Sequence, residues 1–268
     1  MRNLLSLSYA ILCALFAATI GGYLWGAAQQ VAWLKDLSLN VGTEIFGILL
    51  TVFLIDAVIR RNEERERNRV RQIAFQQLRI PLLHQLHMLH GMYKGCIPRQ
   101  PEIVPASIRE LFSDDYFVQL AFLDFSKPAP LSSTVPLQWF DYLKMEVEKF
   151  KAALGRTIEK YAVFLDADSI ALLERLMDAS FISLIAQAPA IRDVDRRENF
   201  RRSYNLLAGQ GMAELIRKYT EAFCQLVETY NLAVPAELKL ALDSGLWRND
   251  MSPQFDSARL VVPRAAQA

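Results

Sequence analysis

The three histidines of the chain lie close together in the sequence HQLHMLH, as His84, His87 and His90. Imidazole binds transition metals and titrates near neutral pH, so the cluster is a candidate for metal binding or pH sensing. In a helix, each histidine would be rotated by about 60° from the last, and all three could not meet one ion without further ligands. The spacing therefore favours structural or solvated histidines, with a metal site and a pH sensor as the alternatives.

Other patterns that support catalysis are missing from the sequence. The chain has no phosphate-binding GxxxxGK[ST] or GxGxxG loop, no HExxH helix and no GxSxG nucleophile turn. Its three cysteines, Cys13, Cys96 and Cys224, are widely spaced and form no CxxC pair, which excludes a disulfide scaffold and a zinc ribbon. We therefore predict no enzymatic activity, no catalytic residue and no cofactor.

A run of arginines near residue 200 is a further candidate site, for phosphate, nucleotide or lipid headgroups. Its members are Arg192, Arg196, Arg197, Arg201 and Arg202. Carboxylates interrupt the run at Asp193, Asp195 and Glu198. This mixture of charges favours a solvated loop or the start of a helix over an anion site.

Charge is distributed unevenly along the chain. Only five of the 30 basic and 29 acidic residues lie before residue 60, and residues 3–34 carry none. A net charge of +1 excludes a globally basic protein, so we predict no nucleic-acid partner. The sequence thus describes one lipid-like region and one water-soluble region.

Two apolar runs, at residues 4–28 and 41–59, are long enough to cross a membrane. As helices they would reach about 37 Å and about 28 Å, against a hydrocarbon core of ~30 Å. The competing interpretation of the first run is a cleaved signal peptide, but the run is far longer than the usual ~7–15 apolar residues. We predict a transmembrane hairpin within residues 1–59.

Basic residues predict the orientation of this hairpin. The connector at residues 29–40 has one lysine and one aspartate, whereas Arg60, Arg61 and Arg65 begin a cluster directly after the second run. Cationic residues resist translocation, so both termini are expected in the cytoplasm. These three arginines are also predicted to contact lipid headgroups.

Small residues recur every four positions in the first apolar run. They are Ala10, Ala14, Ala18, Gly22 and Gly26. Small side chains let two helix backbones approach closely in lipid, so this row predicts a helix-packing face. Its partner is either the second run or another copy of the chain.

The second run carries a polar stripe at spacings of 4, 3 and 4, formed by Asn40, Glu44, Gly47 and Thr51. Asp56 points about 120° away from Glu44 and lies one turn before Arg60, a suitable ion-pair partner. Ionisable groups in lipid usually face protein or water. Glu44 is therefore either wet near the outer surface or part of an oligomeric interface or aqueous path.

This stretch resembles the second span of a broad group of uncharacterised bacterial two-span membrane proteins. The resemblance is carried by Asn40-Val-Gly-Thr-Glu-Ile-Phe-Gly47, then Thr51, then Ile55-Asp56 before an Arg/Glu-rich helix. It covers about 50 residues. The resemblance implies a location in the bacterial cytoplasmic (inner) membrane and implies no activity.

Beyond residue 59 the pattern predicts helices separated by one proline-rich segment. Residues 60–96 are expected to form a juxtamembrane helical stalk, charged at first and then amphipathic, that Pro81 kinks or divides. Residues 97–136 hold six of the eleven prolines and predict a connector with short helices at 106–112 and 114–123. Its aromatic residues suggest that it packs onto the remaining helices.

Residues 137–248 predict a helical bundle. Apolar residues from Phe140 to Leu165 recur at spacings of three and four, which predicts one long helix. A break at residues 166–168 starts a second helix to about residue 187, and a third apolar stripe runs from Met212 to Tyr230. Residues 249–268 are expected to be a loose tail.

The sequence therefore predicts an all-α protein, with a transmembrane hairpin and a cytoplasmic helical bundle. We expect the hairpin to anchor an interaction or signalling module that binds a protein partner. The alternative is an oligomeric membrane effector or channel in which the small-residue row and Glu44 build a pore gated by the bundle.

Overall fold

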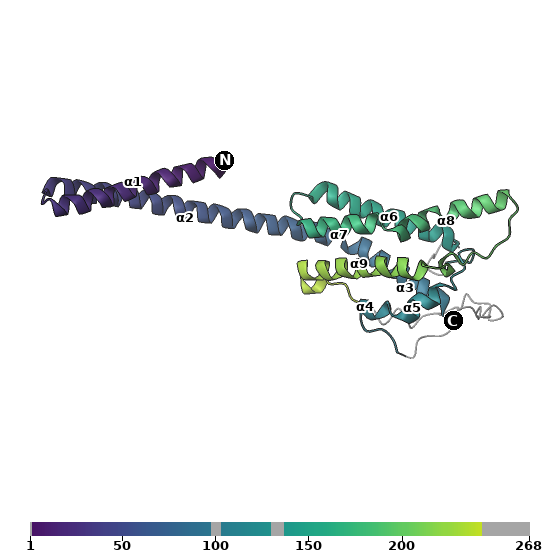
Figure 1. Cartoon of the computed structure of the whole chain (residues 1–268). Helices are drawn as coiled ribbons and strands as arrows, with labels where there is room; N and C mark the ends of the chain where they lie inside the picture. Colours follow the sequence, from purple (N-terminus) through teal and green to yellow (C-terminus); the bar gives the residue numbers. More distant parts are fainter. Residues whose placement is uncertain (1, 98–102, 130–136, 243–268) are drawn as a thin grey trace. The chain divides into compact units, whose positions relative to one another are not determined.

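The computed structural model describes residues 2–97, 103–129 and 137–242, with no side-chain placement before residue 10 (Figure 1). Within these ranges the chain is helical and has no strand, apart from one isolated bridge between Pro128 and Gln138. The all-α prediction is confirmed for these residues. The chain divides into two units, Met1–Asn68 and Arg69–Ala268, each described by itself below.

The first unit is a helical hairpin. Helix α1 (Arg2–Ala28) turns at residues 29–31 into α2 (Ala32–Gln77), and α1 lies alongside the first part of α2 (Figure 1). The ring centroids of Phe16 and Phe46 are 5.9 Å apart across this pair. Helix α2 begins nine residues before the second apolar run, because residues 32–40 contain no proline or glycine that would end a helix.

Pro81 divides the expected stalk into two helices. Helix α2 ends at Gln77, and α3 (Arg79–Cys96) carries Pro81 in its first turn. A proline has no N–H to donate and its ring would clash with the carbonyl of Gln77, so α2 cannot continue through it. Phe75, Leu78 and Leu82 are buried, so the second half of the expected stalk is part of the core of the second unit.

In the described residues, the second unit is a helical bundle of α3 and six further helices. Helix α6 (Trp139–Tyr161) packs against α3, α7 (Ala167–Met177) and α8 (Ser180–Arg197). Helix α9 (Met212–Ala233) packs against α5 (Asp114–Leu120), α7 and α8. Short pieces complete the described part, namely α4 (Ile108–Leu111) and the 3₁₀ turns η1 (Leu206–Ala208) and η2 (Ala236–Leu238).

Apolar stripes expected from the sequence form the core of the bundle. Phe140, Leu143, Val147, Phe150 and Leu154 of α6 are all buried. The aromatic residues of the connector join the same core, with Tyr116, Phe117 and Phe125 buried and Phe112 packed against it. The connector therefore packs onto the bundle, as its composition suggested.

The helix expected to run to about residue 187 is two helices. Helix α7 ends at Met177, Asp178 and Ala179 leave helical geometry, and α8 starts at Ser180 and continues to Arg197. The apolar spacing passes through this break without a gap, so periodicity alone could not locate it. The predicted tail at 249–268 lies outside the described residues.

Candidate functional site

Glycines of α1 bring the two helices of the hairpin together. A Cβ atom added to Gly22 would lie 2.8 Å from Ser38 Oγ, and one added to Gly26 would lie 3.1 Å from the backbone N of Lys35. From the other side, a Cβ on Gly42 would lie 3.2 Å from Thr19 Oγ1. The partner of Gly22 and Gly26 is therefore α2 of the same chain.

The other members of the small-residue row do not contact α2. Ala10, Ala14 and Ala18 are exposed, and the α1 residues turned toward α2 include Leu12, Phe16 and Thr19 instead. Steps of four residues advance a helix by about 400°, so a strict four-residue row drifts by about 40° per step. Over sixteen residues it crosses from one face of α1 to another, which is why one row cannot serve one interface.

The polar stripe of α2 lies on the face that points away from α1. Asn40, Glu44, Gly47 and Thr51 are all exposed, and nothing lies within 4 Å of a Cβ built on Gly47. Thr51 Oγ1 donates a hydrogen bond to the carbonyl of Gly47 at 2.8 Å. Within the described residues, Asn40 and Glu44 thus carry the stripe's remaining hydrogen-bonding side chains.

Arginines at the end of the apolar part of α2 differ in their pairing. Arg60 Nε lies 2.9 Å from Asp56 Oδ2, as the spacing of these residues indicated. Arg61 and Arg65 are exposed and form no ion pair in the described part of the chain. Of the three arginines predicted to contact headgroups, these two offer an uncompensated charge.

The three histidines are in different surroundings, so they do not form one site. His84 is exposed, His87 is half-buried and His90 is 3% exposed in α3. No group of three or more His, Cys, Asp or Glu side chains among the described residues could hold a metal ion. Burial, followed by the charges of Lys94 and His87, lowers the pKa of His90 to about 4.

The arginine run near residue 200 is tied into the fold. Arg202 binds the buried carboxylate of Asp195 through two hydrogen bonds, of 2.6 and 2.7 Å. Arg192 donates to Asp141 at 2.7 Å and lies over the ring of Phe140. Both arginines thus hold the C-terminal part of α8 against its surroundings. The run begins in the last turns of α8, which ends at Arg197, and continues into the non-helical segment that holds Arg201 and Arg202.

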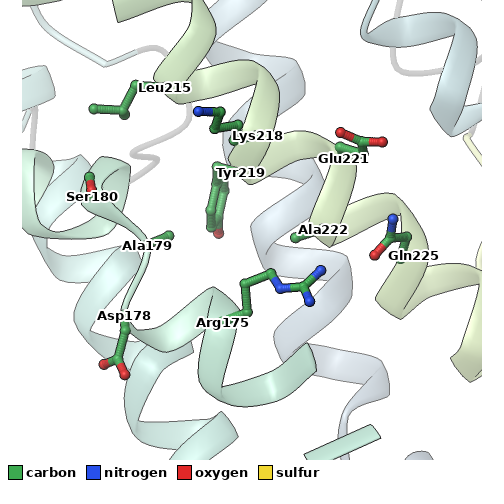
Figure 2. Close-up of a pocket in the computed structure, with 10 residues that line it drawn as sticks. All are labelled: Arg175, Asp178, Ala179, Ser180, Leu215, Lys218, Tyr219, Glu221, Ala222 and Gln225. Atoms are coloured by element: carbon green, nitrogen blue, oxygen red, sulfur yellow. The ribbon is translucent and has the colours of Figure 1, made fainter. Parts of the chain in front are cut away.

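A groove of about 490 Å³ lies between the α7–α8 junction and α9. Figure 2 shows Arg175 from α7 and Lys218 from α9, with Tyr219 between them in this view. Asp178 and Glu221 add negative charge to the same rim. The break between α7 and α8 shapes the groove, because Asp178, Ala179 and Ser180 line it.

Tyr219 forms the floor of this groove and joins it to the core. Its side chain is 2% exposed, its ring lies 4.8 Å from that of Phe181, and its hydroxyl accepts a hydrogen bond of 2.7 Å from Gln85 Nε2. Burial raises the pKa of Tyr219 well above its usual value. The Tyr219 hydroxyl is therefore neutral and hydrogen-bonded, which suits a structural role beneath the groove and not proton transfer.

A second groove, of about 440 Å³, continues the first one along α7. Both are lined by Arg175 and Gln225, and the second adds Arg71, Asp166 and Thr229. Arg71 is ion-paired with Asp166, which also caps α7 by accepting from Ser169 N at 2.7 Å. Arg175 forms no ion pair in the described residues and is exposed. Sequence reasoning missed these residues, because apolar spacing locates a core and gives no sign of a gap between two helices.

The two grooves together form an open trough that is lined by apolar residues such as Leu172 and Ala222 and by charged residues of both signs. Such a surface suits an extended or helical segment with charged side chains of its own. No protein-family model, no curated protein and no solved structure matches the chain.

Proposed function

We propose that this chain is a protein of the bacterial cytoplasmic membrane, in which the hairpin of α1 and α2 spans the bilayer. Both termini then lie in the cytoplasm, where the bundle binds a segment of another protein in the trough between α7 and α9. The chain acts by binding and localisation, without catalysis and without a cofactor.

The observation that carries the anchor is the exposure of the hairpin's apolar side chains. Helices α1 and α2 each contain a stretch that is long and apolar enough to cross a membrane. In the most apolar part of each, only 6% and 0% of the residues, respectively, are buried. Leu24, Trp25 and Phe53 are each about 60% exposed. Exposed apolar surface of this extent is unfavourable in water and favourable in the apolar interior of a lipid bilayer.

Charge supports the orientation. The turn and the start of α2 carry one lysine and one aspartate, whereas Arg61 and Arg65, after the apolar stretch, form no ion pair with any described residue. Arginines of this kind stay on the cytoplasmic side and meet anionic headgroups. The lipid bilayer is therefore the first partner that we propose.

The trough supports a protein partner. It is open to solvent, and it carries charged residues of both signs, which is typical of a polar rim around an apolar contact. A small molecule would be held poorly by two shallow, connected grooves, since small-ligand sites are concave and enclose most of the ligand. A chain segment can follow the whole length of α7.

Extraction and reporter fusions test the anchor. We expect the full chain to stay with membranes through alkaline carbonate washing. An enzymatic reporter fused at residue 35 should be active only outside the cytoplasm, and one fused at residue 268 only inside it. A C-terminal reporter on the outer side, or release by carbonate, would contradict the proposed anchor and orientation.

Photo-crosslinking in living cells tests the trough. A photoreactive amino acid at Gln225, in the shared wall, should give an adduct of one discrete mass. The matched control is the same amino acid at Lys151, which is exposed on α6 and lines neither groove. Arg175→Glu should weaken the Gln225 adduct without changing the melting temperature. Equal labelling at both positions would show that the trough has no selective partner.

The gated channel is the second function that the sequence suggested. In the hairpin, Thr51 already donates to a backbone carbonyl, so the exposed stripe offers only Asn40 and Glu44 to water. Two polar side chains are few for a water path across a core of ~30 Å. These observations favour the anchor over the channel.

A further inference from the structure

We propose that two copies of the chain pack in the membrane along the face of α2 that points away from α1. Asn40, Glu44, Gly47 and Thr51 form the centre of this interface. The inference rests on the proposed membrane insertion of the hairpin and adds a partner, a second copy of the chain, that the anchor itself does not require.

The face in question is unoccupied within the hairpin. Gly42 faces Thr19 of α1, and Glu44 follows it by two residues, which is about 200° around the helix. The four residues of the stripe are exposed, and a side chain at Gly47 would meet nothing within 4 Å. Helix α1 therefore leaves this polar face uncovered.

The unbroken helix places Glu44 deep in the apolar region. Asp36 and Arg60 are charged residues that flank this region within α2, and their separation of 24 positions corresponds to about 36 Å along the helix. Glu44 then lies about 6 Å from the midpoint, which is well inside a hydrocarbon core of ~30 Å. At such a depth, ionisable and amide side chains face protein or water instead of lipid. Under the proposal, a second protein surface covers Glu44.

A second copy of α2 supplies the hydrogen bonds that this face lacks. In a parallel pair related by a two-fold axis, each residue faces its own copy at the same height, and residues one turn along the other helix are within reach of its side chain. The side-chain amide of Asn40 in one copy can then donate to the carboxylate of Glu44 in the other, and symmetry repeats the bond. Donor and acceptor are on one helix face, so the face is complementary to itself.

The shape of the face also fits a close helix pair. Spacings of 4, 3 and 4 residues keep the stripe on the seam of two helices that cross at a shallow angle. Gly47 leaves a notch at its centre, and Thr51, bonded to the carbonyl of Gly47, presents a small and satisfied surface beside it. Backbones can approach closely at such a notch in lipid.

The outer face of α1 is the other surface that a second copy could offer, and it is a poorer match. Its exposed small residues include Ala10, Ala14, Ala17 and Gly21, none of which has a polar side-chain group. Packing α2 against them would leave Asn40 and Glu44 without hydrogen-bond partners. The two arrangements predict opposite results for substitutions at Gly47 and Gly21.

Disulfide cross-linking in native membranes tests the face. The full chain carrying Cys13→Ser has its two remaining cysteines, Cys96 and Cys224, buried in the bundle. Leu54→Cys lies seven residues after Gly47, on the same face, whereas the neighbouring Phe53→Cys lies at the same depth about 100° away. Mild oxidation should give a covalent dimer with Leu54→Cys and little with Phe53→Cys. Equal yields from the two positions would overturn the proposal.

Paired glycine substitutions then identify the helix in contact. Gly47 and Gly21 both have open space around them, so leucine at either position leaves the hairpin intact. Gly47→Leu should abolish the Leu54→Cys dimer, and Gly21→Leu should leave it unchanged. Glu44→Ala should weaken dimerisation by about 3- to 30-fold, which is the range for one or two interhelical hydrogen bonds in a membrane.

Carbonate extraction of each variant distinguishes a failure of the membrane anchor from a failure of the interface along α2. A chain that extracts as a soluble protein would contradict the anchor. A chain that stays in the membrane but gives no Leu54→Cys dimer, or loses the dimer with Gly21→Leu in place of Gly47→Leu, would contradict only the interface along α2.

Discussion

The hairpin and the bundle are both built from helices, yet they place their apolar side chains in opposite directions. In the bundle, the rings of Trp139, Tyr116 and Phe223 are fully buried. In the hairpin, Trp25, Trp33 and Phe53 are more than 60% exposed, and the closest approach of the two helices is at small or polar residues such as Gly22 and Ser38.

This difference shows which force holds each unit together. The bundle buries apolar surface from water, so removing that burial should unfold it. In the membrane location that we propose, the hairpin gains little from burying apolar groups that lipid would surround, so close backbone contact holds it instead. Substitutions of the two kinds should therefore act on one unit and spare the other.

The largest expected effect is a charge placed in the core of the bundle. Leu154→Asp, or Phe150→Asp, buries an unpaired carboxylate and should reduce the free energy of unfolding by about 4 kcal/mol or more. Hydrogen exchange of the α6 amides in the full chain measures this loss and reports each helix separately. The exposed Glu148→Ala is the control and should change stability by less than about 0.5 kcal/mol. Equal exchange in all these variants would show that the α6 seam is not a core.

Lowering the pH should also destabilise the bundle, through protonation of His90. Its pKa is lowered to about 4 in the folded state from 6.5, so the unfolded chain binds the proton first as pH falls. The stabilising effect of the neutral side chain is present above about pH 6.5 and is lost as pH falls toward 4. We expect a loss of roughly 3 kcal/mol across this window, at about 1.4 kcal/mol per pH unit. Denaturant unfolding of the wild type and of His90→Phe measures it, and the variant should lack this slope. An unchanged slope would assign the acid sensitivity to other groups.

A smaller effect is expected in the hairpin. Gly22→Leu places a side chain where even a Cβ would meet Ser38 Oγ at 2.8 Å, so α1 and α2 must separate. Overpacking of this kind typically costs about 1–3 kcal/mol. Spin labels at Ile20 and Leu39, both exposed, should report a longer distance, while exchange in α6 stays unchanged. The neighbouring Gly21→Leu should leave the distance as it is, and a shift with Gly21→Leu alone would reverse our assignment of the faces.

The smallest expected effect is on ion flow. Planar-bilayer recordings of the wild type, Gly22→Leu and Glu44→Gln should all show no conductance, because the hairpin offers too few free polar groups to line a water path. A conductance in the wild type that Glu44→Gln alters would favour the channel over the anchor.

The sequence was sufficient to predict the helices and their inward faces, with two instructive exceptions. The spacing of Phe140 to Leu154 identified the α6 seam, because a long amphipathic helix repeats its signal many times. The break after Met177 left no such signal, since no proline or glycine marks it and Phe181 keeps the apolar spacing. The trough lined by Arg175 depends on that break and was missed with it.

The second exception is the small-residue row. Its even spacing suggested one packing face, and the structure turns only Gly22 and Gly26 toward α2. A row repeats strictly every four residues, whereas a helix repeats every 3.6, so a long row must leave any single interface. Which part of it contacts the second helix depends on how the two helices are rotated, and one helix alone does not contain that information.

The sequence by itself determined where the chain is apolar, where it is charged and where it is helical, because these are local properties that each segment carries alone. The tertiary structure decided that Ser38 and Gly42 face α1, that Asn40, Glu44 and Gly47 face outward, and that α7 and α9 leave a trough between them. These outcomes depend on how helices distant in sequence rotate and approach one another. Packing between elements sets that relation, and no single stretch of residues specifies it.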